Sequence, residues 1–484
     1  MKQLSSGWNF DNTYCTLPDE LFSVTQATPV KDPELLLFNK DLAHVLGLSD
    51  HDDTVFELSG NRTPKGAKPL AQAYAGHQFG HFTMLGDGRA ILLGEQVTPN
   101  EGRVDIQLKG SGRTPYSRGG DGRATLYSML REYLISEAMH YLEIPTSRSL
   151  AVVKTREPVY RQTVHPGAVL TRVMSSHMRV GTFEYIRQFH TVELLKQFME
   201  YVIERHYTHL KNAENPALEL LKAVTEKQTK LVVDWLRIGF IHGVMNTDNT
   251  SVIAETFDYG PCAFMNSYNP KTVFSSIDTY GRYAYGNQPA VTQWNLAVFA
   301  GTLLPLIHTD EDEAQKLAEA VIDAFPNVFN QQWIAMMCSK IGIEIPQESD
   351  KAFIQTLLQW MMKKEADYTN TFTDLRKLVE GGMLTDSIYQ DELFVSWQQK
   401  WLERLDANPN GKQTAIELMQ RANPVVIPRN HLVEKALIEG ANGDMSFFHQ
   451  LVTVLKKPYE SPDDSLFTLP PEHGDAGYQT FCGA

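Results

Sequence analysis

One stretch of the chain decides how the rest is interpreted: His242-Gly243-Val244-Met245-Asn246-Thr247-Asp248-Asn249, followed after a short apolar run by Asp258-Tyr259-Gly260. Taken alone, the run Asn-Thr-Asp-Asn is an ordinary turn signal, because Asn and Asp side chains hydrogen-bond their own backbone. A short motif of this kind indicates a nucleotide site only if its partners stand elsewhere in the chain. The partners to look for are a lysine and a phosphate-binding loop upstream.

The spacing matches the metal site of protein kinases, which carry H-x-D-x-x-x-x-N followed by D-F-G. There the Asn and the second Asp hold Mg²⁺ against the ATP phosphates, and the first Asp orients the attacking hydroxyl. Here His242 and Asn249 occupy the outer positions, and Asp258 begins the matching triplet. Val244 stands where the first Asp would be. The stretch therefore predicts a kinase metal site that lacks its usual base.

Composition excludes several other classes of protein. The chain has 484 residues, 42% of them hydrophobic, and a formal net charge of −14. An acidic chain of this kind is not expected to bind nucleic acid or anionic membrane in general. We see no apolar run long enough to span a bilayer, and no secretory or transit signal at the N-terminus. We therefore expect a cytoplasmic protein, a monomer, with neither a nucleic-acid nor a membrane partner.

A glycine-rich turn lies upstream of this stretch, at residues 86–89. Gly86 and Gly88 would let backbone N–H groups approach a phosphate closely, and Arg89 would add charge. The Asp-Gly step between them also predicts a hairpin between two strand-like runs. An ordinary hairpin remains the alternative to a phosphate-binding turn.

Residues 103–109 alternate cleanly between apolar and polar side chains and predict a strand that ends at Lys109. Kinases carry their phosphate-binding lysine at such a place. The alternative is a solvated lysine at a strand end. The loop that follows, residues 110–123, holds five glycines and three arginines. Such a loop could bind phosphate, with Asp121 capping the next helix, or could be flexible and solvated.

Residues 124–142 predict one amphipathic helix. A kinase-like lysine needs a glutamate on this helix. The helical wheel favours Glu137, which lies inside the apolar stripe, over Glu132 on its flank. The order of strand, lysine, loop, helix and strand is that of the N-terminal lobe of a kinase with an enlarged loop.

The remaining chain is predicted to be mostly helical, apart from an aromatic and glycine-rich segment after residue 275 that is placed like an activation segment. We therefore predict an α+β, protein-kinase-like two-lobe fold with an N-terminal extension and added C-terminal helices. The predicted parts are an extension at 1–70, an N-lobe at 71–165, a C-lobe core at 166–310, and a helical region with an extended tail at 311–484. The helices predicted in the last two parts are 192–212, 215–238, 291–308, 310–325, 350–365, 370–380, 388–405, 410–421, 432–439 and 444–456.

The motifs occur together and in one order along nearly the whole chain. The blocks are Tyr74-x-Gly-His-Gln-Phe-Gly80, Gly86-Asp-Gly-Arg89, Gln107-Leu-Lys-Gly-Ser-Gly112, Arg131-Glu-Tyr-Leu-x-Ser-Glu-Ala138, Arg179-Val-Gly-Thr-Phe-Glu184, His242 to Asn249, Asp258-Tyr-Gly-Pro261, Asn423-Pro-x-x-Ile-Pro-Arg-Asn-His431 and a terminal Cys-Gly-Ala. This sequence closely resembles the selenoprotein O (SelO, also called YdiU) family. The resemblance implies a kinase-like fold without the usual catalytic Asp. It also implies ATP bound in a flipped orientation and transfer of AMP to hydroxyl side chains of proteins.

The resemblance also implies a role for each matching residue. Lys109 would contact phosphate, with Glu132 rather than Glu137 as its partner. Asp248 would accept the proton. Mg²⁺, or Mn²⁺ in its place, would be held by Asn249 and Asp258. The residues implied to bind ATP are Gly86, Gly88, Arg89, Lys109, Asp121, Gly122, Arg172, Arg179 and Asp258.

Cysteine usage gives one further expectation. The chain has four cysteines and no C-x-x-C pair, so a zinc site is not expected. Cys482 stands where some members of the resembled family carry selenocysteine, which implies a weaker redox role. Cys262 is the cysteine nearest to the predicted site in sequence.

Two other functions stay open on the sequence alone. One is an atypical kinase that transfers the γ-phosphoryl group, and Val244 argues against it. The other is a pseudokinase scaffold that binds nucleotide without turnover. The intact set of Lys109, Asp248, Asn249 and Asp258 argues against the scaffold. For AMP transfer, flipping ATP would place the α-phosphorus beside the acceptor, and the Arg-rich loop would offset the charge of pyrophosphate.

Overall fold

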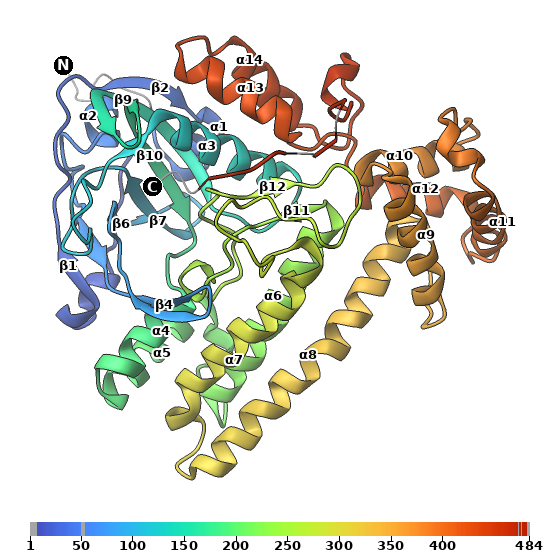
Figure 1. Ribbon diagram of the computed structural model, residues 1–484. Helices are drawn as coiled ribbons and strands as arrows, with labels where there is room; N and C mark the ends of the chain where they lie inside the picture. Colours follow the sequence, from blue (N-terminus) through green and yellow to red (C-terminus); the bar gives the residue numbers. More distant parts are fainter. Residues whose placement is uncertain (1–6, 50–53, 473, 476, 482–484) are drawn as a thin grey trace.

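The structure is a computed structural model that describes residues 7–49, 54–472, 474–475 and 477–481. It is a mixed α+β protein with a sheet-rich N-terminal part and a helical C-terminal part (Figure 1). The strands of the main sheet lie before residue 175, and helices make up most of the chain after it. The sequence-based α+β class is therefore confirmed.

The main sheet has eight strands in the order β1-β3-β6-β7-β10-β9-β2, with β8 pairing to β10. Every pairing in it is antiparallel. The strands are β1 (Phe22–Val24), β2 (Glu34–Phe38), β3 (Leu70–Gln72), β6 (Ala90–Val97), β7 (Arg103–Lys109), β8 (Ala124–Thr125), β9 (Arg148–Tyr160) and β10 (Val164–Met174). The two outermost strands, β1 and β2, both come from the first forty residues. The predicted division of the chain into four parts stays a prediction.

Both faces of the sheet are covered, which follows from the alternation of side chains along a strand. On β9, Val152 packs into the core formed with α3 (Leu126–Tyr141), and the next residue, Val153, packs toward α1 (Lys40–Leu46) and α2 (Thr54–Leu58). On β7, Ile106 and Leu108 lie on the α1–α2 side. The alternate residues of β7, including Lys109, are therefore on the side of α3 and are buried too.

The helical part begins after β10 and is built around three long helices that pack on one another: α6 (Pro216–Arg237), α7 (Gln288–Ile307) and α8 (Glu311–Lys340). Helix α8 continues through Pro326, so the predicted end at residue 325 is wrong. It continues because its far half packs on α9 and α12. The other helices are α4 (Val180–Phe189), α5 (Val192–His206), α9 (Asp350–Lys364), α10 (Tyr368–Val379), α11 (Glu392–Asp406), α12 (Gly411–Ala422), α13 (Asn430–Ala441) and α14 (Ser446–Leu455).

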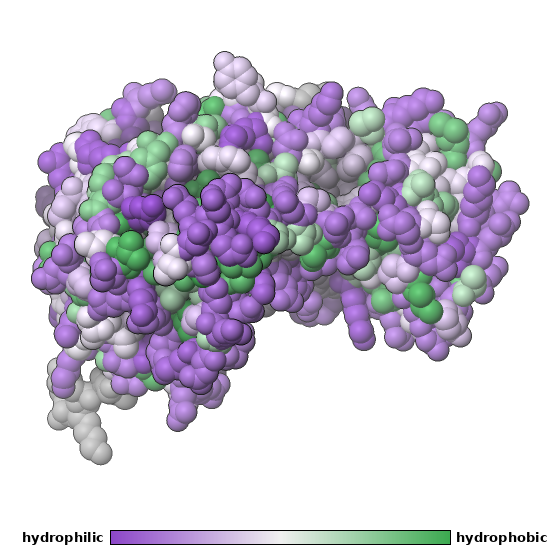
Figure 2. All heavy atoms as spheres, turned by 90° about the horizontal axis from the view of Figure 1, so that it is seen from below, coloured by the Kyte–Doolittle hydropathy of each residue, from purple (hydrophilic) through white to green (hydrophobic). Residues whose placement is uncertain are grey.

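The expectation that no apolar run is long enough to span a bilayer is wrong for one helix, by length and composition. The segment Tyr285–Ile307 is long and apolar enough to cross a membrane by length and composition, and half of the tested window is buried. It consists largely of α7, which packs on α4, α6 and α8. A buried core helix passes the same test, and we take α7 as one. The face seen from below, toward the far ends of α7 and α8, is mostly hydrophilic with scattered hydrophobic residues (Figure 2).

The predicted hairpin at Asp87-Gly88 is wrong. The hairpin lies earlier, where β4 (Ala75–Gln78) pairs with β5 (His81–Met84). Its two turn residues, Phe79 and Gly80, both have positive φ, +51° and +86°. Positive φ at both positions is the type I′ geometry that matches the twist of paired strands. Asp87 lies beside β3 instead, where its backbone N–H donates to Gln72 O at 2.9 Å.

Candidate active site

A cleft of about 660 Å³ lies where the main sheet meets the first loops of the helical part. Its lining includes glycines from the turn before β6, cations from β7 and β10, and acids from the loops after β11 (Phe240–Ile241). The predicted site residues that line this cleft are Gly86, Gly88, Arg89, Lys109, Asp121, Gly122, Arg172, Arg179, Asp248, Asn249 and Asp258. The fold thus brings residues more than 170 positions apart to one cavity.

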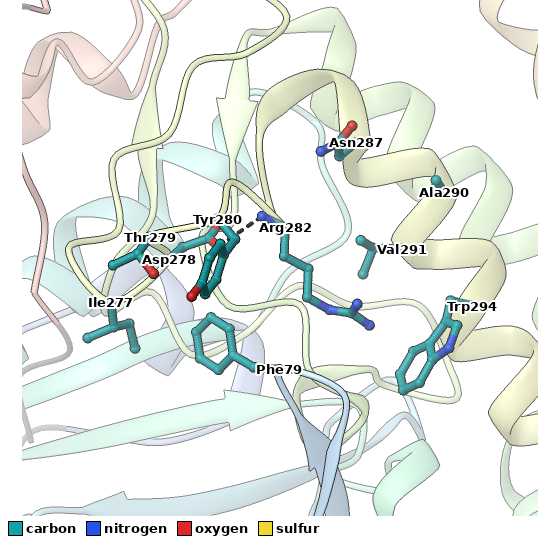
Figure 3. A pocket seen from close by; sticks show the side chains of 10 residues that line it. All are labelled: Phe79, Ile277, Asp278, Thr279, Tyr280, Arg282, Asn287, Ala290, Val291 and Trp294. Atoms are coloured by element: carbon teal, nitrogen blue, oxygen red, sulfur yellow. Dashed lines mark hydrogen bonds between the residues drawn. The ribbon is translucent and has the colours of Figure 1, made fainter.

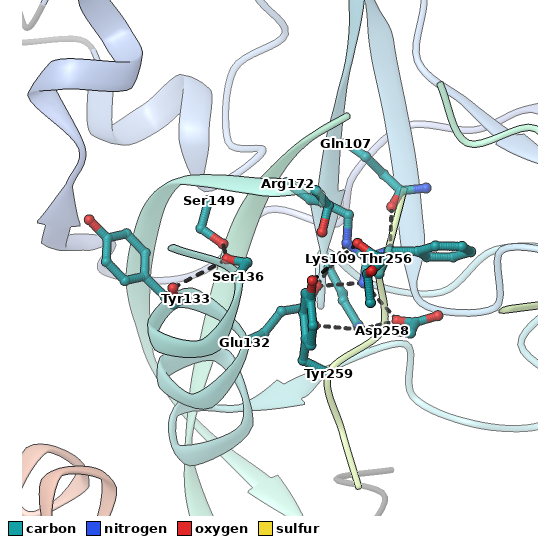
Figure 4. A network of polar contacts seen from close by, with 12 residues as sticks. Gln107, Lys109, Glu132, Tyr133, Ser136, Ser149, Arg172, Thr256, Asp258 and Tyr259 are labelled. Atoms are coloured by element: carbon teal, nitrogen blue, oxygen red, sulfur yellow. Dashed lines mark hydrogen bonds and ion pairs between the residues drawn. The ribbon is translucent and has the colours of Figure 1, made fainter. Parts of the chain in front are cut away.

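Four charged side chains form a closed network on one wall of the cleft (Figure 4). Lys109 Nζ lies 2.6 Å from Glu132 Oε2 and 2.5 Å from Asp258 Oδ1. Arg172 Nη2 lies 2.5 Å from Glu132 Oε1 and 2.6 Å from the same Asp258 oxygen. Burial alone would raise the pKa of Asp258, but the two cations outweigh it and hold that pKa well below its ordinary value. Two cations thus balance two carboxylates.

The glutamate that pairs with the lysine is Glu132, so the helical-wheel choice of Glu137 is wrong. Glu137 instead binds Arg148, with Oε2 to Nη2 at 2.7 Å, and accepts from Asn39 Nδ2 at 2.8 Å. Both glutamates are only 3% exposed. The wheel identified a buried glutamate correctly but could not tell which neighbour it would meet.

Asp248 is a buried carboxyl group that lines the cleft. Burial raises its pKa to about 6, partly offset by Arg179. Its Oδ1 is buried without a hydrogen-bond partner among the described residues. Gly76 packs so tightly against it that an added Cβ would lie 2.8 Å from the Asp248 side chain. A carboxyl group with a pKa near neutrality can accept a proton from a hydroxyl.

Asn249 is the next residue, and the backbone of Val244 orients its side chain. Its Nδ2 donates to the carbonyl of Val244 at 3.0 Å, which leaves the amide oxygen as the atom available to a cation. Asp258 likewise binds Lys109 and Arg172 through Oδ1, which leaves Oδ2. Within the described residues no group of three or more His, Cys, Asp or Glu could hold a metal ion. Any metal here would rely on these two oxygens together with water and phosphate.

The glycine-rich turn is shaped by close packing, not only by flexibility. Gly86 has φ +108°, and a Cβ there would lie 2.4 Å from the ring of Tyr116. Tyr116 belongs to the Gly/Arg loop, which folds back over the turn: Thr114 Oγ1 donates to Asp87 O at 2.6 Å. Gly122 has φ +67°, and a Cβ there would lie 2.0 Å from Gly112 O. The loop therefore has a defined path over the cleft.

The expectation that Asp121 caps the following helix is wrong. Thr125 caps α3 by accepting from Ser128 N–H at 3.3 Å. The carboxylate of Asp121 binds Arg161 Nη1 at 2.9 Å instead. Arg161 lies 40 residues further along the chain, in the turn between β9 and β10, and was not among the predicted site residues.

Arg179 is the most enclosed cation of the cleft. Its guanidinium lies 4.0 Å from the centre of the Tyr74 ring and 4.9 Å from that of Phe257. Its Nη1 donates to the backbone oxygen of Asp248 at 3.0 Å. The buried Asp87 carboxylate stands 3.8 Å from Nη2. Tyr74 and Asp87 were not among the predicted site residues, although both lie inside the motif blocks. The prediction for these blocks rested on glycine backbone N–H groups and on Arg89.

The cysteines give no redox pair among the described residues. Cys482 lies outside those residues. Cys262 is a buried free thiol, and burial raises its pKa to about 11. The tail does return to this region, since Thr480 Oγ1 donates to Pro261 O at 2.6 Å and Thr480 N–H donates to Phe274 O at 2.8 Å.

Comparison with known proteins identifies the class of this site. A family model described as "Protein adenylyltransferase SelO" matches residues 5–456. The chain therefore belongs to this family, and with it to the nucleotidyltransferase enzymes. The predicted resemblance is confirmed.

Curated relatives agree over their full length. A protein of Pelagibacter ubique is 52% identical over 485 residues, covering 99% of this chain and 100% of the relative. A protein of Nitrosococcus oceani is 53% identical, covering 100% and 99%. One of Alkaliphilus metalliredigens is 52% identical, covering 99% and 98%. All three are named "Protein nucleotidyltransferase YdiU".

Proposed function

We propose that this protein transfers AMP from ATP to hydroxyl side chains of Ser, Thr or Tyr in other proteins and releases pyrophosphate. The observation that carries the proposal is a pair of positions in one loop. Val244 occupies the place of the kinase proton acceptor, whereas Asp248, four residues later, has a pKa of about 6 and an unpartnered buried oxygen. The acceptor hydroxyl would then meet its base at a different point from the substrate hydroxyl of a kinase.

The architecture supports a kinase-like two-lobe arrangement around this loop. Lys109 on β7 pairs with Glu132 on α3, the strand and helix that follow one another in a kinase N-lobe. Asp258 joins them from the helical part. The cleft lies between these two parts of the chain and has the size of a small-molecule site.

The proposed reaction needs little covalent chemistry from the protein. The acceptor oxygen attacks the α-phosphorus, the bond from that phosphorus to the bridging oxygen breaks, and pyrophosphate leaves. Asp248 takes the hydroxyl proton. Lys109 and Arg172 cannot offset much new charge, since Glu132 and Asp258 already balance them. Three arginines of the Gly/Arg loop line the cleft. Arg123 is bound to backbone carbonyls and Glu157, so Arg113 and Arg118 would face the pyrophosphate end of a flipped ATP.

Mg²⁺, or Mn²⁺ in its place, fits the donors that remain. Asn249 Oδ1 and Asp258 Oδ2 would hold it, and such a small set suits an ion that keeps several waters and binds phosphate oxygens. The ion would supply Lewis-acid neutralisation of the phosphates. The protein's part is to fix the two donors, Asn249 through Val244 and Asp258 through Lys109 and Arg172.

The test is incubation with Mg²⁺ and either α-³²P-ATP or γ-³²P-ATP, using wild type and Asp258→Ala. Incorporation of label from the α position but not from γ, lost in the variant, would support AMP transfer. Incorporation from γ would make the protein an atypical kinase. ATP binding without incorporation, even with a panel of cytosolic proteins added, would favour a pseudokinase scaffold. A cytoplasmic location, a monomeric state and the absence of nucleic-acid or membrane partners stay predictions.

A further inference from the structure

A second cavity, of about 510 Å³, lies next to the cleft and is used by none of the groups above (Figure 3). Three separate elements form it: the turn of the β4–β5 hairpin, the irregular segment after residue 275, and the first turns of α7. We call it the side groove. Its main lining residues are Phe79, Ile277, Tyr280, Arg282, Val291 and Trp294.

Hydrogen bonds connect the side groove to the loop of residues 242–249, which carries Asp248. Asn246 Oδ1 accepts two hydrogen bonds, from Phe79 N–H at 3.1 Å and from Tyr283 Oη at 2.6 Å. Asn246 also lines the cleft, two residues before Asp248. Of two consecutive hairpin residues, Gln78 lines the cleft and Phe79 lines the groove. The two cavities therefore share a wall.

The turn of the hairpin holds this wall in one position. Phe79 has φ +51°, a left-handed conformation that is unusual for a bulky residue. The adjoining Asn246 bond and the contact with the Tyr283 ring, 5.1 Å between centroids, hold it there. The wall between the two cavities is therefore rigid.

The cation in the groove is held by aromatic side chains and has no carboxylate partner among the described residues. Arg282 lies over the Trp294 ring at 4.7 Å, and its Nε is buried without a hydrogen-bond partner in the described chain. Its guanidinium also lies 5.8 Å from the centre of the Tyr283 ring, and it partly offsets the rise in pKa that burial gives the Tyr283 hydroxyl. The nearby Asp278 is committed elsewhere, since its two oxygens accept from the backbone N–H groups of Arg282 and Tyr283 at 2.9 and 2.8 Å.

Exposed apolar and aromatic side chains line the same groove as Arg282. Tyr280 is 99% exposed and Ile277 is 49% exposed, both on the segment after residue 275. An arginine stacked on tryptophan beside exposed aromatic side chains has the composition of a binding hot spot.

We propose that the side groove binds the stretch of the acceptor protein that lies beside its hydroxyl, and that Arg282 selects an acidic residue there, with an apolar neighbour packing on Trp294 and Ile277. This inference rests on the proposed function, because it places the acceptor hydroxyl at Asp248. The shared wall at Phe79 and Asn246 lets one extended segment enter both cavities. An extended chain advances about 3.3 Å per residue, so a fixed separation of Asp248 and Arg282 would appear as one fixed offset between the hydroxyl and the acidic residue.

The test uses synthetic peptide libraries with one central Ser, Thr or Tyr and degenerate flanks, labelled with α-³²P-ATP. Wild type should favour Asp or Glu at a fixed offset by roughly two- to fivefold, the size of one partly exposed charge pair. Arg282→Glu should reverse the preference to Lys or Arg at that offset, and Arg282→Lys should restore it in part. Trp294→Leu should weaken labelling of the preferred peptides without altering ATP binding.

Arg421→Glu on α12 is the matched control, an exposed arginine far along the chain, and should keep the wild-type preference. Melting temperature and ATP binding of each variant check that the fold is intact. Labelling without any positional preference, or with a preference that Arg282→Glu leaves unchanged, would overturn the inference but not AMP transfer. No labelling of any peptide or of the protein itself by wild type would overturn both. A change in sedimentation of Arg282→Glu, with the preference unchanged, would assign the groove to a second copy of the chain.

Discussion

Helix α3 carries two buried glutamates, each at the centre of a cluster of charged and polar side chains. One cluster borders the cleft, and the other is enclosed by protein. At Glu132 the cluster contains Lys109, Arg172 and Asp258 and borders the cleft. At Glu137, five residues on, the cluster contains Arg148 and Asn39 and lies between β9 and the start of α1. We call them the cleft cluster and the sheet cluster.

The difference lies in access, not in the burial of the glutamates. In the cleft cluster the Asp258 side chain is 30% exposed, so a ligand can reach the network. In the sheet cluster Glu137 accepts from Arg148, from Asn39 and from the Ser149 backbone, so protein groups occupy both of its oxygens. A charge that a ligand can reach can serve binding and catalysis, whereas a charge enclosed by protein can only stabilise the fold. The variants below test this distinction.

The largest effect is expected for Arg172→Met, which removes the cation that joins both carboxylates of the cleft cluster. Glu132 and Asp258 would then share Lys109 alone and would repel each other, so Asp258 would lose its position. We expect AMP transfer to fall by about 10²- to 10³-fold, as when a preorganised charge is lost. The control is Arg148→Met in the sheet cluster, assayed on the folded fraction. An equal loss of activity in both variants would contradict the distinction between the clusters.

Glu132→Gln should lower AMP transfer by about 10²-fold, because Lys109 and Arg172 lose one of their two anions and shift toward Asp258. The variant leaves one uncompensated positive charge beside the cleft. Bound ATP would compensate that charge, so ATP should raise the melting temperature of the variant more than that of wild type. Thermal unfolding with and without ATP measures this. If ATP raised the melting temperature equally in both proteins, the charge of the cleft cluster would not contribute to ATP binding.

Glu137→Gln should destabilise the fold by about 3 kcal/mol, because removing one member of a buried ion pair leaves Arg148 without its counter-charge. Activity of the folded protein should stay within about twofold of wild type, since no ligand reaches this cluster. Urea unfolding gives the stability, and labelling at low temperature gives the activity. ATP should add no extra stabilisation here, in contrast to Glu132→Gln.

The smallest effect is expected for Asn39→Ala in the sheet cluster. Asn39 caps α1 by accepting from Leu42 N–H at 3.1 Å and also donates to Glu137. Loss of the cap and of one hydrogen bond should cost about 2 kcal/mol of stability with no change in activity. A double variant with Glu137→Gln should cost less than the sum of the two, because both changes remove the same contact. Strict additivity would mean that the cap alone carries the effect.

Much of the secondary structure could be predicted from the sequence because its signals are local. The alternation in residues 103–109 gave β7 with its final Lys109, and the apolar stripe in residues 124–142 gave α3 to within two residues. Most later helices were also located closely. The exceptions mark places where packing outweighs a local signal, as where α8 continues through Pro326.

Partners between distant residues could not be predicted in the same way. The apolar stripe of the helix favoured Glu137 over Glu132, but the position of β7 and β10 over α3 decides which one meets Lys109. Asp121 was expected to cap a helix and binds Arg161 instead. Arg282 carried no signal at all, since its lack of a carboxylate partner is a property of the folded environment.

The sequence by itself determined the family, the α+β class and the residue types at the catalytic loop, because these depend on motifs and on periodicity along the chain. The tertiary structure alone decided which charges neutralise one another, which face the cleft, and that a second groove with an arginine held by aromatic side chains adjoins Asp248. The physical reason is that electrostatic partnership depends on distance and burial in space. Both are set when the sheet and the helices pack, and neither is encoded in any single stretch of residues.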